Sequence, residues 1–208
     1  MSFPIHPLDK ALGDITSIRR QVARTTEFRG YGAATLAVTG VFAILAAVAQ
    51  NYLVPNPANH IGAYLRVWVT TAIVSAALIG MQTLTRARRI HSGLADEMIF
   101  MAVEQFLPSV GAGALIAIVL IRFVPNCVWM LPAMWQITFS LGVFASCRFL
   151  PRPMAAAAGW YLITGLASLA IGDARALSPW SMGIAYGVGQ LIVAGVLLWG
   201  SKESPDEI

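Results

Sequence analysis

Apolar residues occur along this chain in long runs, and charged residues interrupt the runs at regular intervals. One run separates Arg66 from Arg86, and its 19 residues are all uncharged. As an α-helix these residues would span about 28 Å, close to the roughly 30 Å hydrocarbon core of a bilayer. The pattern therefore predicts a membrane-spanning helix with a charge marking each end.

Five further runs have the same character, and Pro, Asn or charged residues separate them. Because a helix satisfies its backbone hydrogen bonds internally, the chain is expected to be all-α, a polytopic bundle of six transmembrane helices. This bundle occupies residues 30–200, and residues 201–208 form a tail. The predicted spans are 30–54, 67–85, 105–121, 128–147, 154–171 and 179–200.

The segment before the first span is predicted to be an amphipathic surface helix over residues 1–29. Its apolar residues recur at helical spacing, which favours a helix lying on the cytoplasmic leaflet. Its function is either a topological anchor or a docking surface for a partner. The apolar stripe comprises Leu8, Ala11, Leu12, Ile15, Ile18 and Val22, with Lys10, Arg20 and Arg24 opposite.

Composition supports the membrane assignment, since 57% of residues are hydrophobic and 12% are charged, against about a quarter charged in soluble domains. Eleven Lys and Arg residues fall on the side that holds both termini, and three on the other. By the positive-inside rule, both termini are predicted to be cytoplasmic. This asymmetry accounts for the net charge of +4 without nucleic acid.

The spans group into three helical hairpins with a common pattern. The first helix of each has small residues near its cytoplasmic end, and the second begins beside Trp68, Trp129 or Trp180. The pattern is either an internal repeat or the general preference for small residues at contacts and tryptophan at interfaces. Gly183, Gly187 and Gly189 predict a face of the sixth span that packs closely on another helix.

Ionisable residues avoid the middle of every predicted span, which argues against a proton-driven pump. Two cysteines and three histidines are too few for a Cys/His metal site, and no nucleophile–base pair is visible. We therefore expect no metal, no cofactor and no catalytic residue, and a bound lipid is the ligand that this composition favours.

The candidate ligand site lies at the outer rim of the bundle. Three arginines, a carboxylate and a histidine there would together bind an anionic group such as a lipid phosphate. The alternative is a set of snorkelling arginines with one salt bridge that closes the bundle. The residues are His60, Arg66, Arg122, Asp173 and Arg175.

A second candidate lies on the inner side of the third span. Glu97 and Glu104 are seven residues apart, hence on one helix face, and Pro108 follows one turn later. They form a hinge or pocket, or they mark where an interfacial segment meets the span, or they neutralise the Arg86–Arg89 connection. Polar uncharged residues that would line a cavity or bond between helices include Thr70, Thr71, Gln136, Tyr161, Tyr186 and Gln190.

A charged N-terminal segment ending in EFRGYGAAT, followed by six short spans, resembles bacterial six-span inner-membrane proteins without an assigned function. The resemblance implies the fold and transfers no functional residue. We expect a non-enzymatic membrane module that binds a lipid-like or small amphipathic ligand or a partner protein. The alternatives are a small oligomeric transporter or channel and, third, an intramembrane enzyme. The partners implied are membrane lipids, a second copy of the chain or another membrane protein, and no nucleic acid.

Overall fold

The computed structural model describes residues 32–87, 93–147 and 153–200. These residues form helices joined by short turns, without strands in the described ranges. The predicted surface helix over residues 1–29 and the tail over residues 201–208 lie outside the described residues. The elements are α2 (Ala33–Leu53), α3 (Ile61–Ala87), α4 (Gly93–Phe123), the 3-10 helix η1 (Pro125–Met130), α5 (Leu131–Ser146), α6 (Met154–Ala170), the 3-10 helix η2 (Ala174–Leu177) and α7 (Pro179–Gly200).

Five segments in the described part of the chain are long and apolar enough to cross a membrane, so this is a multi-pass membrane protein. The helix α6 is apolar but has 17 residues, fewer than the other five segments. The crossing segments are Ala33–Leu53, Ile61–Gln82, Val103–Phe123, Pro125–Ser146 and Pro179–Trp199.

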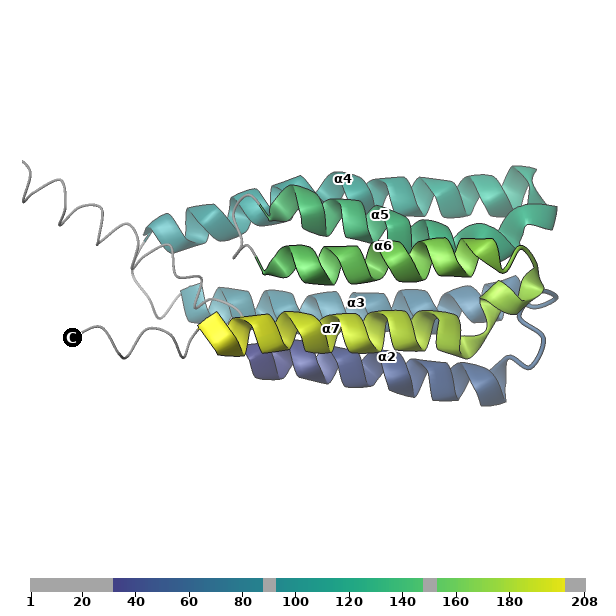
Figure 1. Ribbon diagram of the computed structural model, residues 1–208, viewed down its shortest axis with the longest axis horizontal. Helices are drawn as coiled ribbons and strands as arrows, with labels where there is room; N and C mark the ends of the chain where they lie inside the picture. Colours follow the sequence, from purple (N-terminus) through teal and green to yellow (C-terminus); the bar gives the residue numbers. More distant parts are fainter. Residues whose placement is uncertain (1–31, 88–92, 148–152, 201–208) are drawn as a thin grey trace, which may run out of the picture.

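The helices lie side by side along the long axis of the molecule (Figure 1). The closest packing is between α2 and α7 and between α5 and α6, which are pairs from different predicted hairpins. The two helices of each predicted hairpin also touch, so contacts run continuously in the order α4, α5, α6, α7, α2, α3. We call the end of the bundle that carries the 54–60 turn, η1 and η2 the distal end.

Glycines allow α2 and α7 to approach closely. A Cβ atom added at Gly183 would lie 2.5 Å from the Cβ of Ala47, and one at Gly187 would lie 2.6 Å from the Cδ1 of Ile44. Gly189 faces the other way, against the ring of Tyr161 on α6. The three glycines of α7 therefore contact two different helices, and all three contacts are within the chain.

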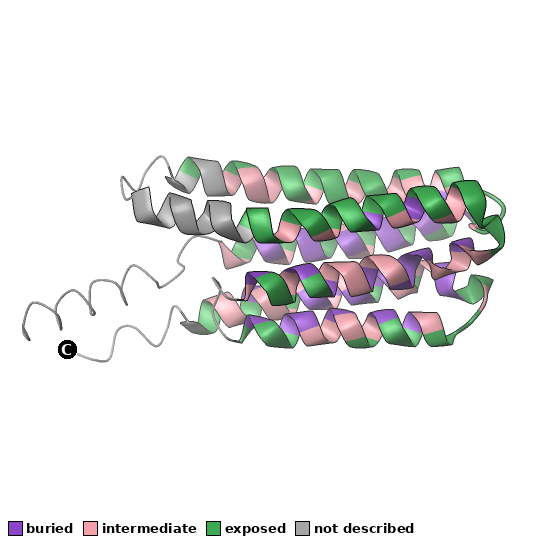
Figure 2. Cartoon of the chain, turned by 90° about the horizontal axis from the view of Figure 1, so that it is seen from above, coloured by how far each residue is buried: buried purple, intermediate pink, exposed green. Residues whose placement is uncertain are grey.

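Buried residues lie on the sides of the helices that face one another, and exposed apolar residues lie on the outward sides (Figure 2). The ring of Phe139 on α5 is central: its centroid lies 4.7 Å from that of Tyr161 and 5.3 Å from that of Tyr186. The ring of Phe106 on α4 packs edge-on against it at 5.1 Å. This aromatic cluster joins α4, α5, α6 and α7.

Two helix boundaries differ from the predicted spans. The helix α3 begins at Ile61, so Arg66 lies more than one turn inside it. The helix α4 begins at Gly93, twelve residues before the predicted span 105–121, and it continues through Pro108 although proline supplies no backbone N–H to the helix. Charges mark where a helix leaves the hydrocarbon region, whereas the helix itself ends where its backbone hydrogen bonds end.

Candidate functional site

The charged residues predicted for the outer rim all lie at or near the distal end, but they do not form one cluster. Asp173 caps the start of η2: its Oδ1 accepts the backbone N–H of Arg175 at 2.8 Å. The Nε of Arg175 also lies 2.9 Å from Oδ2 of Asp173. These two residues are only two positions apart in the chain, so local geometry is sufficient to pair them.

This pairing stabilises the charged forms of both groups. The hydrogen bond from the Arg175 side chain, followed by that from its backbone N–H, lowers the pKa of Asp173. The hydrogen bond to Asp173 in turn raises the pKa of Arg175. Because both side chains are largely exposed, the ion pair contributes little to stability. The alternative prediction for the rim included one salt bridge that closes the bundle, whereas this pair lies within the single turn of η2.

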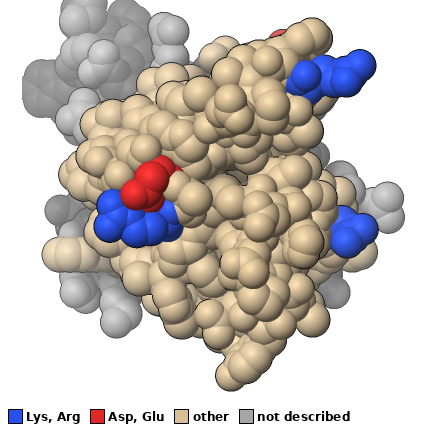
Figure 3. Space-filling view, turned by 90° about the vertical axis from the view of Figure 1, so that its right-hand side faces the viewer, with Lys and Arg blue, Asp and Glu red and all other residues tan. Residues whose placement is uncertain are grey.

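Arg66, Arg122 and His60 are exposed, and none forms an ion pair within the described residues. Figure 3 looks onto the distal end and shows the basic side chains at separate places around it. His60 directly precedes α3, and its carbonyl accepts the backbone N–H groups of Ala63 and Tyr64 in the first turn of the helix. The structure thus brings two of the five rim residues together and separates the others.

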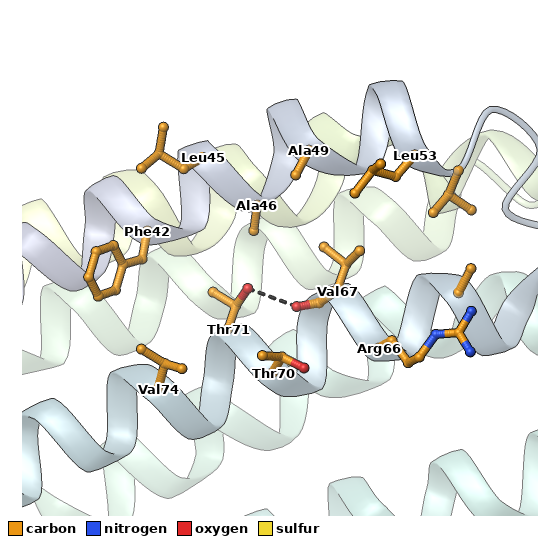
Figure 4. Close-up of a pocket in the computed structure, with 12 residues that line it drawn as sticks. Phe42, Leu45, Ala46, Ala49, Leu53, Arg66, Val67, Thr70, Thr71 and Val74 are labelled. Carbon is orange, nitrogen blue, oxygen red and sulfur yellow. Dashed lines mark hydrogen bonds between the residues drawn. The ribbon is translucent and has the colours of Figure 1, made fainter.

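Arg66 lies in a groove between α2 and α3 that sequence analysis did not predict. The groove has a volume of about 600 Å³ and is open along its side (Figure 4). Among the described residues that line it, Arg66 is the only charged one and none is acidic. The lining includes Phe42, Leu45, Ala46, Ala49 and Leu53 of α2 and the next residue, Val54. From α3 it includes Ala63, Arg66, Val67, Thr70, Thr71 and Val74.

Small side chains on α2 leave space where α2 and α3 meet. Ala46 and Ala49 of α2 lie opposite α3 (Figure 4), and Ala63 of α3 also lines the groove. The opposite face of α2 is packed tightly on α7, so α2 does not move toward α3 to fill the space. A shallow apolar channel with one end at Arg66 remains.

Two threonines provide the other polar groups in the groove. Thr71 donates its hydroxyl to the carbonyl of Val67 at 2.8 Å, so its hydrogen is already used within the helix (Figure 4). Thr70 is exposed, and its hydroxyl has no hydrogen-bond partner within the described part of the chain. It lies four residues after Arg66, hence about 6 Å further along the same helix face.

Behind the groove, a buried chain of hydrogen bonds holds α3 to the bundle. The indole Nε1 of Trp68 donates to Oε1 of Gln50 at 2.6 Å, and Nε2 of Gln50 donates to the carbonyl of Leu177 at 2.8 Å. Trp68 is 4% exposed and Gln50 is fully buried. Sequence analysis placed Trp68 at the membrane interface and omitted Gln50, although a glutamine in an apolar helix signals a buried partner.

On the inner side the candidate residues are separate. Glu104 and Pro108 are both exposed on α4. Glu97 belongs to α4, but its side chain lies outside the described part of the structure. No ion pair joins Glu104 to another residue in the described ranges. The described residues also contain no group of three metal-ligating side chains.

No protein-family model matches this chain, and comparison with curated proteins and with solved structures finds no match. The structural feature that points to a function is the groove between α2 and α3, which has Arg66 in its lining.

Proposed function

We propose that this protein is a non-enzymatic inner-membrane module that binds a lipid-like, amphipathic molecule in the lateral groove between α2 and α3. The observation that carries the proposal is the shape and composition of this groove. It is apolar over most of its length, it is open on one side, and it has a cation in its lining. An amphipathic molecule has the same division into an apolar body and a polar end.

The position of the groove suits a ligand that arrives from the bilayer. Exposed apolar residues such as Leu45 and Val74 border it, so in a membrane its open side faces lipid. A ligand with an acyl chain would enter by lateral diffusion without crossing water. A water-soluble ligand would gain little from the same surface.

Lipid retention in groove-filled variants tests this proposal. Ala49→Phe places a ring in the groove, whereas Ala114→Phe places the same ring on an exposed position of α4 as a control. Native mass spectrometry of gently solubilised protein should show fewer bound lipids for Ala49→Phe than for Ala114→Phe and the parent chain. Equal lipid retention in all three proteins would exclude the groove as the binding site.

We further propose that the termini are cytoplasmic and that the distal end faces the outer side of a bacterial inner membrane. The support is the excess of Lys and Arg on the terminal side of the predicted spans. A reporter that is active only in the cytoplasm should be active when it is fused after Ile208, and a reporter that is active only in the periplasm should be inactive there. A periplasmic reporter that is active at this position would reverse the assignment.

A small oligomeric transporter or channel is the second candidate, and buried polar atoms favour it. The hydroxyl of Tyr161 and Oε1 of Gln190 are buried without a partner in the described structure. Water in a conducting path would satisfy such atoms. In a background with Cys127→Ser and Cys147→Ser, labelling of Gln190→Cys by a water-soluble thiol reagent would support a path. Absence of labelling, with labelling of an exposed control such as Asn56→Cys, would support the binding module.

A further inference from the structure

We infer that the ligand of the α2–α3 groove is an anionic lipid, with its phosphate at Arg66 and one acyl chain along the groove. This inference rests on the proposed function and adds the chemical class of the ligand. The charge of the groove lining is the first support. Arg66 has no acidic partner within the described residues, and no acidic side chain lines the groove.

The contrast with Arg175 identifies which distal arginine is available. Arg175 is already hydrogen-bonded to Asp173 through Nε. Arg122 is exposed near the end of α4 and does not belong to the groove lining. Arg66 is thus the cation that combines an unpaired guanidinium with an adjacent apolar channel. Guanidinium groups bind phosphate oxygens through paired N–H donors, which suits a phosphate headgroup.

The polar groups of α3 follow the order of polar groups in a glycerophospholipid. Thr70 lies about one helical turn below Arg66, toward the middle of the predicted span. In such a lipid the ester carbonyls lie below the phosphate, between the headgroup and the chains. The unpartnered hydroxyl of Thr70 would therefore donate to an ester carbonyl while Arg66 binds the phosphate.

The volume of the groove fits one chain. A methylene group occupies roughly the volume of a water molecule, about 30 Å³, so 600 Å³ holds about 20 such groups. That number is of the order of one long acyl chain. The second chain of a diacyl lipid would remain in the surrounding bilayer, on the open side of the groove.

The test compares lipid preference in matched arginine variants. The parent chain, Arg66→Gln, Arg66→Lys and Arg122→Gln are incubated with equal amounts of phosphatidylglycerol and phosphatidylcholine of identical chains. Bound lipids are counted by native mass spectrometry. We expect the parent chain and Arg122→Gln to bind the anionic lipid about fivefold more tightly than the zwitterionic one. This is the preference that one solvent-accessible contact between opposite charges would give. Arg66→Gln should lose the preference, and Arg66→Lys should keep part of it.

Further arms separate the causes of failure. If Arg66→Gln retains the full preference while Ala49→Phe loses lipid, the groove binds lipid but the headgroup inference is wrong. If Ala49→Phe retains all its lipid, the proposed function itself is wrong. Loss of preference in both Arg66→Gln and Arg122→Gln would show general surface attraction and overturn the site. Competition by inorganic phosphate alone would show that the headgroup, without a chain, is the ligand and would overturn the lipid assignment.

Thr70→Val tests the ester contact, because valine keeps the shape of threonine and removes the hydroxyl. We expect this variant to bind both ester lipids a few-fold more weakly and to bind ether-linked analogues as the parent chain does. Equal loss for ester and ether lipids would overturn the assignment of Thr70.

Discussion

The indole Nε1 of Trp68 lies 2.6 Å from the side-chain oxygen of Gln50, and this hydrogen bond connects α3 to α2 behind the groove. Gln50 uses its amide nitrogen to bond the carbonyl of Leu177 at the end of η2. One side chain therefore joins α2, the next helix α3 and the distant η2, whose Leu177 lies 127 residues further along the chain. The groove is held open in part because α3 is fixed here, at its distal part, while Ala46 and Ala49 leave space beside it.

Replacing Gln50 with leucine should destabilise the fold strongly. The change keeps a similar volume but leaves the Trp68 indole N–H and the Leu177 carbonyl buried without their partners. We expect a loss of about 2–3 kcal/mol, because each buried polar group that loses its partner bears a desolvation penalty. Thermal unfolding in detergent measures it, with Thr85→Val as an exposed control.

The double variant Gln50→Leu, Trp68→Phe adds a second measurement. Trp68→Phe removes the indole N–H that Gln50→Leu leaves unpaired, so the loss in the double variant should be smaller than the sum of the two single losses. Additive losses would contradict the assigned hydrogen bond.

The contact between α2 and α7 should be sensitive to a single methyl group. Gly183→Ala would place a Cβ 2.5 Å from that of Ala47, and we expect a loss of about 1–3 kcal/mol from overpacking. Gly195→Ala on the same helix is the matched control, because nothing lies within 4 Å of its added Cβ. That variant should unfold at the same temperature as the parent chain or slightly higher. Similar behaviour of both variants would contradict the close approach.

Tyr161→Phe should leave stability unchanged or raise it by about 1 kcal/mol, because the buried hydroxyl that it removes has no partner in the described structure. Ser140→Ala is the contrast. The Ser140 hydroxyl donates to the carbonyl of Ala158 at 2.7 Å, so its removal should lower stability. A large loss of stability in Tyr161→Phe would instead indicate that the hydroxyl binds water, as a transport path requires.

Acid should weaken the η2 turn through Asp173. The pKa of this carboxyl is lowered in the folded state, so its contribution is present above the ordinary pKa of about 3.9 and is lost as pH falls below that value. We expect Asp173→Asn to flatten the change in unfolding temperature between about pH 5 and about pH 3. Arg175→Gln should have the same effect. An unchanged pH profile in both variants would contradict the pairing.

Local hydropathy allowed much of the helical architecture to be predicted from sequence. The segments around 33–53, 61–82, 103–123, 125–146 and 179–199 were all predicted as spans, with boundaries that agree to within six residues. The reason is physical: each membrane helix satisfies its own backbone and meets lipid independently, so its position depends on a local run of apolar residues. A salt bridge of Asp173 was one of the two interpretations of the rim, but its partner was not predicted. The structure pairs it with Arg175, two positions away in the chain.

The groove and the Gln50 network could not be predicted in this way. Both depend on which helices become neighbours, and small-residue faces such as that of α7 fit several partners equally well. Tertiary structure alone decided that α2 packs on α7 through Gly183 and Gly187, and that its other face meets α3 loosely. This packing places Arg66 beside an apolar groove. Which helices pack together depends on the fit of side chains from distant segments, whereas the hydropathy of a single segment decides only that it enters the membrane.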